Sequence, residues 1–567
     1  MKNRYIEYLN SLHNFRSSGA NALAESQSTN EYFNSINVKL GIFDEIVRLI
    51  NSETESVIIL TGHAGDGKST LAIDIYKHFK KISVGSALES PLNEFELITE
   101  GNLSIVKDMS ELSAEDRLTR FEKSMSEPGN WLIVSNTGPL LSTLSDYKGA
   151  GNARSDILRV LDEPLDKIIT DSNKLKDYEK DVYVINLTRL DNAAVGASLI
   201  TRLVSHAGWE VCKSCDKADS CPIKTNRDQL YGSLETVEKR IRWVYQRTNA
   251  YEKRLTMRQM IAQLSLSITG GYDCEDVNGS DDKILFSDIF FGYTNGRLED
   301  KLTRLQGIEL MVKSQYGASI GLKYESPFCS EQNDLINGLQ ENIKYIAKRF
   351  QVKGFEREGI RWRSGLRRIL YLFCPIEDRC YQDFHQLFLK SDNTIDFDFW
   401  AENRGFSYSR SQKKKLKNKC LSVLLEYYTG FNSGQFEKDG VMYLTLKRED
   451  KLLAQSAQLV LFRKNFDDFD IDYDAGERCP VIKYKDISMH MPLPVIDYMF
   501  SSYRGEIGGR LSPVYHAKLD RFRTQILHLD EGKDGEDDVS IIRSGIDGEV
   551  QLYDLELSNN KRSIEKT

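Results

Sequence analysis

The sequence predicts an α/β fold, in which a mainly parallel sheet is covered by helices on both faces. Between residues 51 and 205, short apolar runs alternate with longer segments of helical periodicity, which is the pattern of successive strand–helix units. The first of these runs leads directly into a glycine-rich loop, and the segment after the loop contains neither Gly nor Pro. A buried strand, a tight loop and a helix are therefore expected to follow one another.

Four apolar runs are the predicted strands of the sheet. They comprise residues 57–61, 103–107, 131–135 and 181–187. Helical periodicity marks 113–126 and 138–146 between these runs. It also marks 38–50 before them, so the N-terminal segment is expected to be helical and peripheral.

Composition and charge limit the class of protein. Apolar residues make up 40% and charged residues 28% of the chain, which is ordinary for a globular protein. No apolar stretch approaches a membrane span of about 18 residues, and the first residues carry no signal-peptide pattern. Nine cysteines without an export signal favour a reducing, cytoplasmic location. The net charge of −8 excludes a globally basic nucleic-acid-binding protein, so contact with DNA would need local patches.

The glycine-rich loop has the sequence Gly-x-x-x-x-Gly-Lys-Ser, which is the pattern of a phosphate loop. In such a loop, backbone N–H groups and the N-terminus of the following helix hold the phosphates of a nucleotide. Lys68 would neutralise the β- and γ-phosphates, and Ser69 would bind Mg²⁺. The predicted nucleotide-binding residues are Gly62, Gly65, Asp66, Gly67, Lys68, Ser69 and Thr70. The prediction is therefore a P-loop NTPase of the AAA+/STAND-like kind, with ATP and Mg²⁺ as ligands; a chance glycine turn is the alternative.

Hydrolysis needs further polar groups at the same edge of the sheet. Asp108 follows the second predicted strand and would lie beside Mg²⁺, with Glu111 as a base that orients water. The alternative is that Asp108 only caps the next helix. The pair Asp162-Glu163 is the second choice, although the residues before it have a helical pattern.

Asn136 follows the third predicted strand, where an amide could contact the γ-phosphate or the attacking water. The alternative is that this asparagine makes a turn before Gly138-Pro139. Lys68, Asp108, Glu111 and Asn136 are the predicted catalytic residues. An arginine is also expected at the γ-phosphate, and the spacing leaves several candidates. They are Arg154, Arg189, Arg202, Arg254 and Arg258.

Three cysteines lie within ten residues and suggest a metal site. Cys212 and Cys215 form a Cys-x-x-Cys pair, and Cys221 follows closely. Such thiolates can hold a structural zinc ion or an iron–sulfur centre. The fourth ligand is open, with His206 and Cys274 as candidates, and free surface thiols are the alternative.

Two stretches combine basic and aromatic residues, as surfaces that bind nucleic acids do. They run from Lys348 to Arg368 and from Arg404 to Lys419. The alternative is a solvated helix face, or a surface that meets the acidic stretches 467–474 and 530–538 of the same chain.

These features predict a chain of several parts. The expected division is 1–50 for the N-terminal helical segment, 51–232 for a P-loop ATPase core with a cysteine-bearing insert at 206–232, 233–330 for a helical lid, 331–529 for a mostly helical C-terminal region that docks partners or DNA, and 530–567 for an acidic connector and a small hairpin tail. A second hairpin is predicted at Asp439-Gly440.

Several motifs together resemble the DptF-type ATPases of phosphorothioation-dependent DNA restriction and, more loosely, other P-loop ATPases of bacterial phage defence. They are Gly65-Asp66-Gly67-Lys68-Ser69, Asn136-Thr137-Gly138-Pro139-Leu140, Val184-Ile185-Asn186-Leu187-Thr188-Arg189, Cys221-Pro222, Leu493-Pro494-Val495-Ile496-Asp497-Tyr498, Leu511-Ser512-Pro513 and Arg521-Phe522-Arg523. The resemblance implies an ATPase subunit of an antiviral restriction complex, beside a nuclease or helicase-like partner and a small linker subunit. The alternatives are a nucleotide-dependent assembly switch with little turnover, and a loader ATPase of DNA replication or transposition. Homo-oligomerisation is left open, and no membrane contact is expected.

Overall fold

The computed structural model describes residues 2–566 except 14–27, 84, 149–152, 164–168, 252, 278–284, 294–304, 319–338, 340, 342–343, 345–358, 375–378, 404–405, 433, 435–439, 446–456, 507–510, 531–538, 546–548 and 559–560. Backbone contacts divide the chain into two compact units, Met1–Lys390 and Ser391–Thr567. The boundary expected from the sequence lay near residue 330, whereas helices α19 (Gly359–Phe373) and α20 (Arg379–Leu389) belong to the first unit. There α19 packs against α11 (Leu234–Ala250).

The first unit contains a six-stranded sheet with the strand order β2-β3-β4-β1-β6-β5. The four predicted strands are its parallel core: β1 (Ser56–Thr61), β3 (Leu103–Val106), β4 (Asn130–Val134) and β6 (Asp181–Asn186). The sequence did not reveal the antiparallel edge strands β2 (Phe95–Ile98) and β5 (Lys174–Leu175). Both are short and partly exposed, so neither has the apolar run that marks a buried strand.

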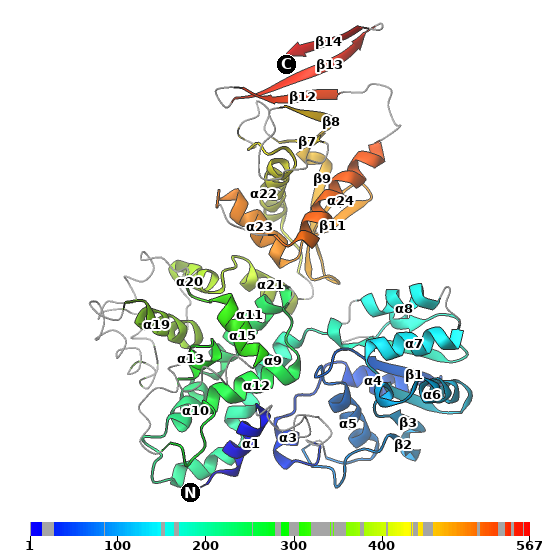
Figure 1. Cartoon of the computed structure of the whole chain (residues 1–567), viewed down its shortest axis with the longest axis vertical. Coiled ribbons are helices and arrows are strands. Elements are labelled where there is room, and N and C mark those ends of the chain that lie inside the picture. The colour runs from blue at the N-terminus through cyan, green and yellow to red at the C-terminus, as the bar shows by residue number, and fades with distance from the viewer. Residues whose placement is uncertain are drawn as a thin grey trace. The chain divides into compact units, whose positions relative to one another are not determined.

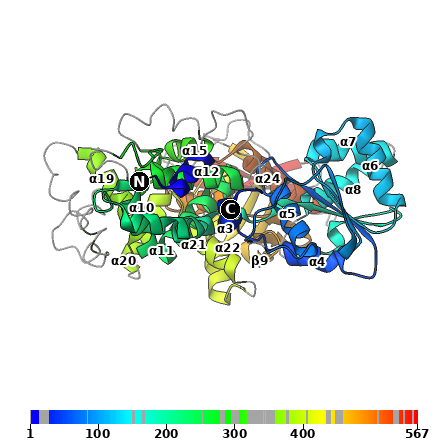
Figure 2. The ribbon, with the colours of Figure 1, turned by 90° about the horizontal axis from the view of Figure 1, so that it is seen from below.

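Helices cover both faces of this sheet, as the alternation of side chains along β1 requires. Ile58 and Leu60 pack toward α4 (Phe43–Ile50) and α5 (Lys68–Phe79). Val57 and Ile59 belong to the core on the opposite face, which α6, α7 and α8 complete. The bounds of these three helices are Ala114–Ser126, Thr137–Lys148 and Ala153–Asp162. Figure 2 shows α4 and α5 on one side of the sheet and α6, α7 and α8 on the other.

The other elements that the structure describes in the first unit are helices (Figure 1). Its further helices are α1 (Arg4–Leu12), α3 (Glu31–Ile36), α9 (Asn192–Ser205), α10 (Pro222–Gly232), α12 (Met257–Thr269), α13 (Phe286–Phe290) and α15 (Gln306–Ser314). Helix α12 is central among them, since it packs against α1, α9, α13 and α15. It begins with a capping box between Thr256 and Gln259 and ends at Gly270, which has φ 63°. The helical lid predicted for 233–330 thus begins with α11 and α12.

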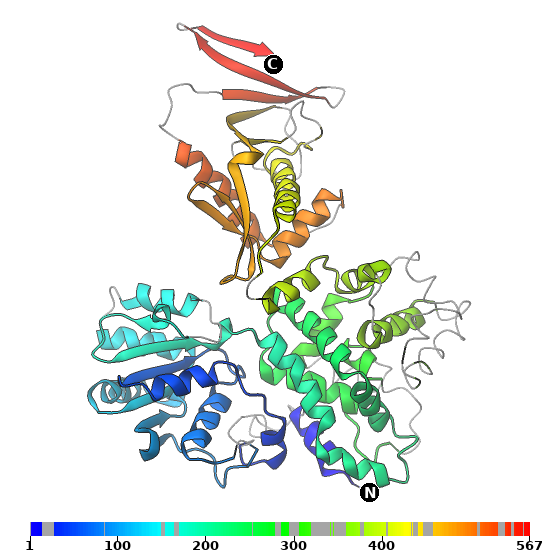
Figure 3. The ribbon, with the colours of Figure 1, turned by 180° about the vertical axis from the view of Figure 1, so that it is seen from behind.

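The second unit combines helices with two antiparallel sheets (Figure 3). Its helices are α21 (Thr394–Glu402), α22 (Arg410–Thr429), α23 (Leu493–Tyr503) and α24 (Pro513–Asp530). One sheet has the order β11-β10-β9, with bounds Ile487–His490, Cys479–Tyr484 and Phe469–Asp474. The other has the order β14-β13-β12-β8-β7, with bounds Lys561–Lys566, Val550–Ser558, Val539–Ser544, Ala457–Asn465 and Val441–Thr445. The C-terminal region therefore contains the expected helices and, in addition, more strands than its sequence revealed.

The two predicted hairpins have different outcomes. The tail hairpin is confirmed, because β12 and β13 pair in antiparallel register. At Asp439-Gly440, residues 435–439 lie outside the described residues, and the strand after them, β7, pairs with β8. In the part of the chain that the structure describes, no helix is long and apolar enough to cross a membrane.

Candidate functional site

A cavity of about 230 Å³ lies at the C-terminal ends of the parallel strands in the first unit. The glycine loop, defined here as residues 62–69, follows β1 directly. Asp108 comes two residues after β3, and Asn136 two residues after β4. Because parallel strands end at one edge of their sheet, these three groups meet, and all of them line the cavity.

The backbone of the glycine loop needs glycine at its turning points. Gly62, Gly65 and Gly67 have φ values of 145°, 89° and 93°, a region that L side chains rarely adopt. At Gly65, a Cβ atom would also lie 3.0 Å from Oγ1 of Thr256 and from Cβ of Arg258. The loop therefore turns sharply while lying close to the start of α12.

Lys68 connects the glycine loop to the neighbouring strand β4. Its Nζ donates to the backbone oxygens of Gly62 and His63 and to Oδ1 of Asn136, each at 2.9 Å. The side chain is buried, which lowers the pKa of its ammonium group, while the carboxylates of Asp66 and Asp108 oppose that shift. A buried ammonium group that is bonded to neutral oxygens at a cavity wall is positioned to bind an anion in that cavity.

Asp108 and Asn136 belong to one chain of hydrogen bonds. Oδ1 of Asp108 accepts the backbone N–H of Ser110 at 2.8 Å and so caps a short 3₁₀ helix, Met109–Glu111. Oγ of Ser110 accepts the backbone N–H of Asn136 at 2.6 Å. The capping role considered for Asp108 is therefore real. The same carboxylate also lines the cavity and interacts electrostatically with Lys68.

The other predicted acids differ in position. Glu111 borders the cavity and is exposed to solvent. The alternative pair Asp162-Glu163 is at the end of α8, does not line the cavity, and Asp162 pairs with Arg189. The prediction of Asp162-Glu163 as an alternative to Asp108 is therefore wrong, because this pair lies at the end of a helix and not at the end of a strand.

Asp66 shapes the glycine loop from within. Its fully buried side chain accepts the backbone N–H of His63 at 2.9 Å and Nη1 of Arg254 at 2.6 Å. Arg254 also donates to the backbone oxygen of Leu187, 3.2 Å away, just after β6. These contacts fix the conformation of the loop. Asp66 and Arg254 do not line the cavity themselves.

Of the candidate arginines, the structure brings Arg258 to the cavity. Its backbone N–H donates to the oxygen of Gly65 at 3.3 Å, and its side chain lines the cavity. Burial lowers the pKa of its guanidinium group. Arg189 is engaged with Asp162, Arg202 is exposed on α9, and the side chain of Arg154 lies outside the described residues.

An apolar wall completes the cavity and was not foreseen from the sequence. Its residues come from the N-terminal segment and from α12. They are Phe33, Ile36, Val38, Leu40, Met257 and Ile261. The segment before β1 is therefore part of the site, whereas its sequence suggested a peripheral helix. The helical periodicity of residues 38–50 was the only feature of the sequence that indicated packing of this segment against the core.

Buried polar bonds attach this N-terminal segment to α5. Nδ2 of Asn37 donates to both carboxylate oxygens of Asp74, each at 3.1 Å. Nζ of Lys77 donates to Oδ1 of Asn34 and to the backbone oxygen of Ser86. Burial raises the pKa of Asp74 to about 6, although Asn37 and Lys77 oppose that shift. The apolar wall and the helix behind the glycine loop are thus joined by buried hydrogen bonds.

The cysteine cluster is separate from this cavity. Cys212, Cys215 and Cys221 are half-buried, without disulfides, around the junction of the 3₁₀ helix Ala207–Ser214 and α10. Within the described residues, no group of three His, Cys, Asp or Glu side chains is arranged to hold a metal ion. Of the two candidates for a fourth ligand, Cys274 neighbours the cluster, whereas Nδ1 of His206 accepts the backbone N–H of Gly208.

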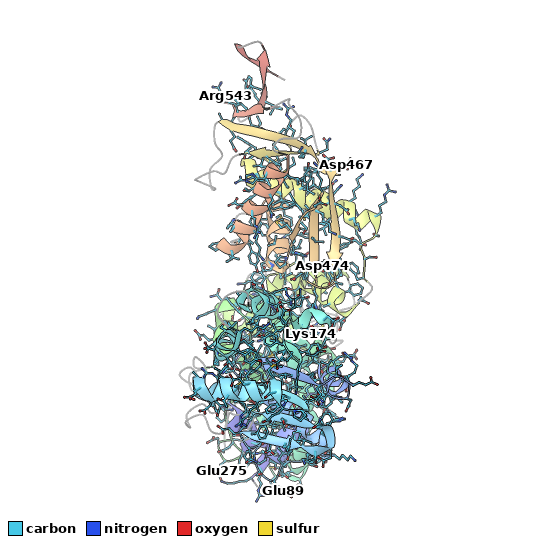
Figure 4. The ribbon with its side chains drawn as sticks, turned by 90° about the vertical axis from the view of Figure 1, so that its right-hand side faces the viewer. Glu89, Lys174, Glu275, Asp467, Asp474 and Arg543 are labelled. Carbon is cyan, nitrogen blue, oxygen red and sulfur yellow. The ribbon has the colours of Figure 1, made fainter. Side chains whose placement is uncertain are left out.

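The basic stretch 404–419 falls mainly on α22, where part of it meets the acidic strand β9. Lys413 pairs with Asp472 at 3.0 Å, and Lys417 contacts Asp467 and the backbone oxygen of Phe469. Figure 4 labels Asp474, at the end of that strand, and Asp467, in the 3₁₀ helix Phe466–Asp468 just before it. The interpretation as an intramolecular surface is therefore confirmed for two lysines. Three further basic side chains of α22 are exposed: Arg410, Lys414 and Lys415.

Most of the other basic stretch, 348–368, lies outside the described residues. At its end, Arg367 donates to the backbone oxygen of Gly317, and Arg368 pairs with Asp288 at 2.8 Å. Both arginines therefore take part in the packing of the first unit. The acidic stretch 530–538 also falls almost entirely on residues that are not described.

The buried Asp74 predicts a specific pH dependence. Its folded-state pKa of about 6 exceeds the ordinary value of 3.8, so the native protein holds a proton that the unfolded chain loses between these values. Stability should therefore fall as pH rises through this window, by up to about 3 kcal/mol. Asp74→Asn keeps an acceptor for Asn37 and removes the penalty. Thermal unfolding from pH 4.5 to 7.5 should show the variant gaining several degrees over wild type, whereas the exposed Asp44→Asn should follow wild type. A constant difference between Asp74→Asn and wild type would contradict the prediction.

The chain matches no model of a protein family, no curated protein and no solved structure. A function for the site is therefore inferred from the residues that gather at the cavity.

Proposed function

We propose that the first unit is a P-loop NTPase that binds Mg–ATP in this cavity and hydrolyses it. One observation carries the proposal. Lys68 joins the glycine loop to Asn136 at the cavity wall, with Asp108 close by. Phosphate-binding backbone, a buried cation, a carboxylate and an amide are the groups that phosphoryl transfer needs.

Each residue has a role in this proposal. The N–H groups at the start of α5 would bind the phosphates, and the dipole of that helix would favour their negative charge. Lys68 would exchange its bonds with loop oxygens for bonds to the β- and γ-phosphates. Ser69 and Asp108 would hold Mg²⁺, which supplies neutralisation of charge on the phosphate oxygens. Asp108 would do so on its cavity side, while Oδ1 continues to cap the 3₁₀ helix.

Hydrolysis would proceed by in-line attack of water on the γ-phosphorus. The bond to the β–γ bridging oxygen breaks, ADP leaves, and the proton of the water ends on the released phosphate or on Glu111. Asn136 would orient the water from the end of β4, and Glu111, exposed at the mouth of the cavity, would accept the proton. Arg258 would stabilise the charge of the γ-phosphate.

The apolar wall would hold the nucleotide base. Phe33, Ile36 and Val38 lie on the N-terminal side of the cavity, and Met257 and Ile261 lie on α12. An apolar pocket beside a polar phosphate site suits a nucleotide, which has one flat apolar end and one charged end. Bound nucleotide would therefore bridge the sheet, the N-terminal segment and α12.

The proposal extends to the complex in which this ATPase would work. The resemblance to DptF-type ATPases favours an ATPase subunit of an antiviral DNA restriction complex, whose partners include a nuclease or helicase-like subunit. The exposed Arg410, Lys414 and Lys415 of α22 offer a place for DNA or a partner in the second unit. Isolation of the complex from its native host, with its subunits identified, tests this part of the proposal.

A nucleotide-dependent switch with little turnover is the second candidate. Two observations favour it: one oxygen of Asp108 is engaged in capping, and Glu111 is exposed rather than held in place. A switch would bind ATP tightly and change its assembly state without steady release of phosphate.

Replacement of Lys68 tests nucleotide binding. Lys68→Ala should weaken the binding of Mg–ATP at least about tenfold, because a charged hydrogen-bond donor to phosphate is lost. Isothermal calorimetry measures this directly. Lys80→Ala is the matched control, since Lys80 lies at the end of the same helix and pairs with Glu100 on the surface. Equal affinity in wild type and Lys68→Ala would refute the site.

Replacement of Asn136 separates an ATPase from a switch. If Asn136 orients water, Asn136→Ala should lower kcat by about 10²-fold, while the affinity for ATP changes only a few-fold. Phosphate release, measured with and without DNA, gives kcat. Wild-type protein that binds ATP but releases no phosphate under either condition would favour the switch and exclude the hydrolytic role.

A further inference from the structure

Four cysteines of the first unit share an environment that the other described cysteines lack. Cys212, Cys215, Cys221 and Cys274 are all half-buried and free. Cys374, Cys420 and Cys479, by contrast, are at most 4% exposed and pack as small apolar side chains. Core packing therefore explains the second group but not the first.

The fold brings these four thiols together from separate segments. Cys212 lies in the 3₁₀ helix Ala207–Ser214, Cys215 directly follows it, and Cys221 directly precedes α10. Cys274 comes more than fifty residues later, four residues after the end of α12 at Gly270. Even so, Cys215, Cys221 and Cys274 all interact electrostatically with Cys212, so the four thiols are neighbours in the fold.

A second observation points to sulfur as an acceptor. Asn3, which caps α1, is buried, and its Nδ2 donates to Sγ of Cys212 at 3.2 Å. Its backbone N–H also donates to the thiol of Cys274. One residue thus directs two N–H donors at two sulfurs of the cluster. Donors of this kind commonly surround metal-bound thiolates, whose negative charge they stabilise.

We propose that Cys212, Cys215, Cys221 and Cys274 bind one zinc ion as four thiolates. Binding would release four protons to solvent and form four Zn–S bonds in a tetrahedron, the usual geometry of a structural zinc site. Among the described residues no three His, Cys, Asp or Glu side chains are arranged to hold a metal ion, so binding would have to draw the four sulfurs closer together. Cys215 and Cys221 flank a short, mostly exposed turn, so this turn can close on the ion.

Such an ion would fasten the far end of α12. This helix begins at the glycine loop, through the bond from Arg258 to Gly65, and runs toward Cys274. Through Asn3, the same cluster also holds the start of α1, which packs along α12. Figure 4 labels Glu275, the residue next to Cys274. Zinc would therefore fix α1, α10 and α12 relative to one another. This inference does not depend on whether the cavity binds ATP.

Metal analysis of the full chain, purified under reducing conditions without chelator, tests the proposal. Wild type should carry about one zinc per chain. After zinc is removed, added Co²⁺ should give the intense sulfur-to-metal absorption of a four-thiolate site. Cys274→Ser should retain less zinc, release it to a colorimetric chelator at least about tenfold faster and weaken this absorption. Cys374→Ala, at a buried cysteine outside the cluster, should behave as wild type.

Three results would overturn the proposal. They are the absence of zinc together with no cobalt spectrum in wild-type protein, the recovery of iron instead of zinc, and equal zinc retention in Cys274→Ser and wild type. If Cys274→Ser fails to fold, the wild-type chain still decides. Stepwise modification of its accessible thiols with an organomercurial should then release zinc as the four cluster cysteines react. Release of zinc before these thiols are modified would also refute the site.

Discussion

The candidate site depends on the hydrogen bonds of the Lys68 ammonium group, which lies between the glycine loop and the end of β4. It requires that β1 and β4 be neighbours and parallel, so that Gly62 and Asn136 meet at one edge of the sheet. It also requires the left-handed turns at Gly65 and Gly67, which direct the first turn of α5 toward that edge. Burial disfavours an unpaired ammonium group, so the three oxygens around Nζ stabilise both the charge and the loop that carries it.

A second constraint comes from the start of α12. Arg254 reaches the buried Asp66, and the backbone of Arg258 reaches Gly65, so the loop is held from the helical side as well as from the sheet. Met257 and Ile261 then face the same cavity as the N-terminal segment. If nucleotide binds there, its phosphates and its base contact different parts of the first unit, and α12 is the element common to both. The proposed zinc site at the other end of this helix would anchor that end to the segments that carry the other cysteines.

The fold of the first unit was largely predictable, and so was the polar part of its site. Buried parallel strands give continuous apolar runs, and the residues that follow such strands meet at one edge of the sheet, which is why the meeting of Lys68, Asp108 and Asn136 could be predicted. The apolar wall could not, because Val38 and Met257 are ordinary apolar residues until the fold brings them together. Apart from the tail hairpin, most strands of the second unit were not predicted, because strands such as β9 and β11 are polar and only partly buried. The basic face of α22 was ambiguous because its partner, β9, is distant in sequence.

The most direct test of the central claim is hydrogen exchange with and without a non-hydrolysable ATP analogue and Mg²⁺. If one nucleotide bridges the glycine loop, the N-terminal segment and α12, then the amides of 62–70, 33–40 and 257–261 should exchange more slowly together in the bound state, and Lys68→Ala should abolish all three effects. Slower exchange at the loop alone would contradict a base pocket formed by the other two segments. Unchanged exchange in all three regions at saturating analogue would contradict the nucleotide site itself.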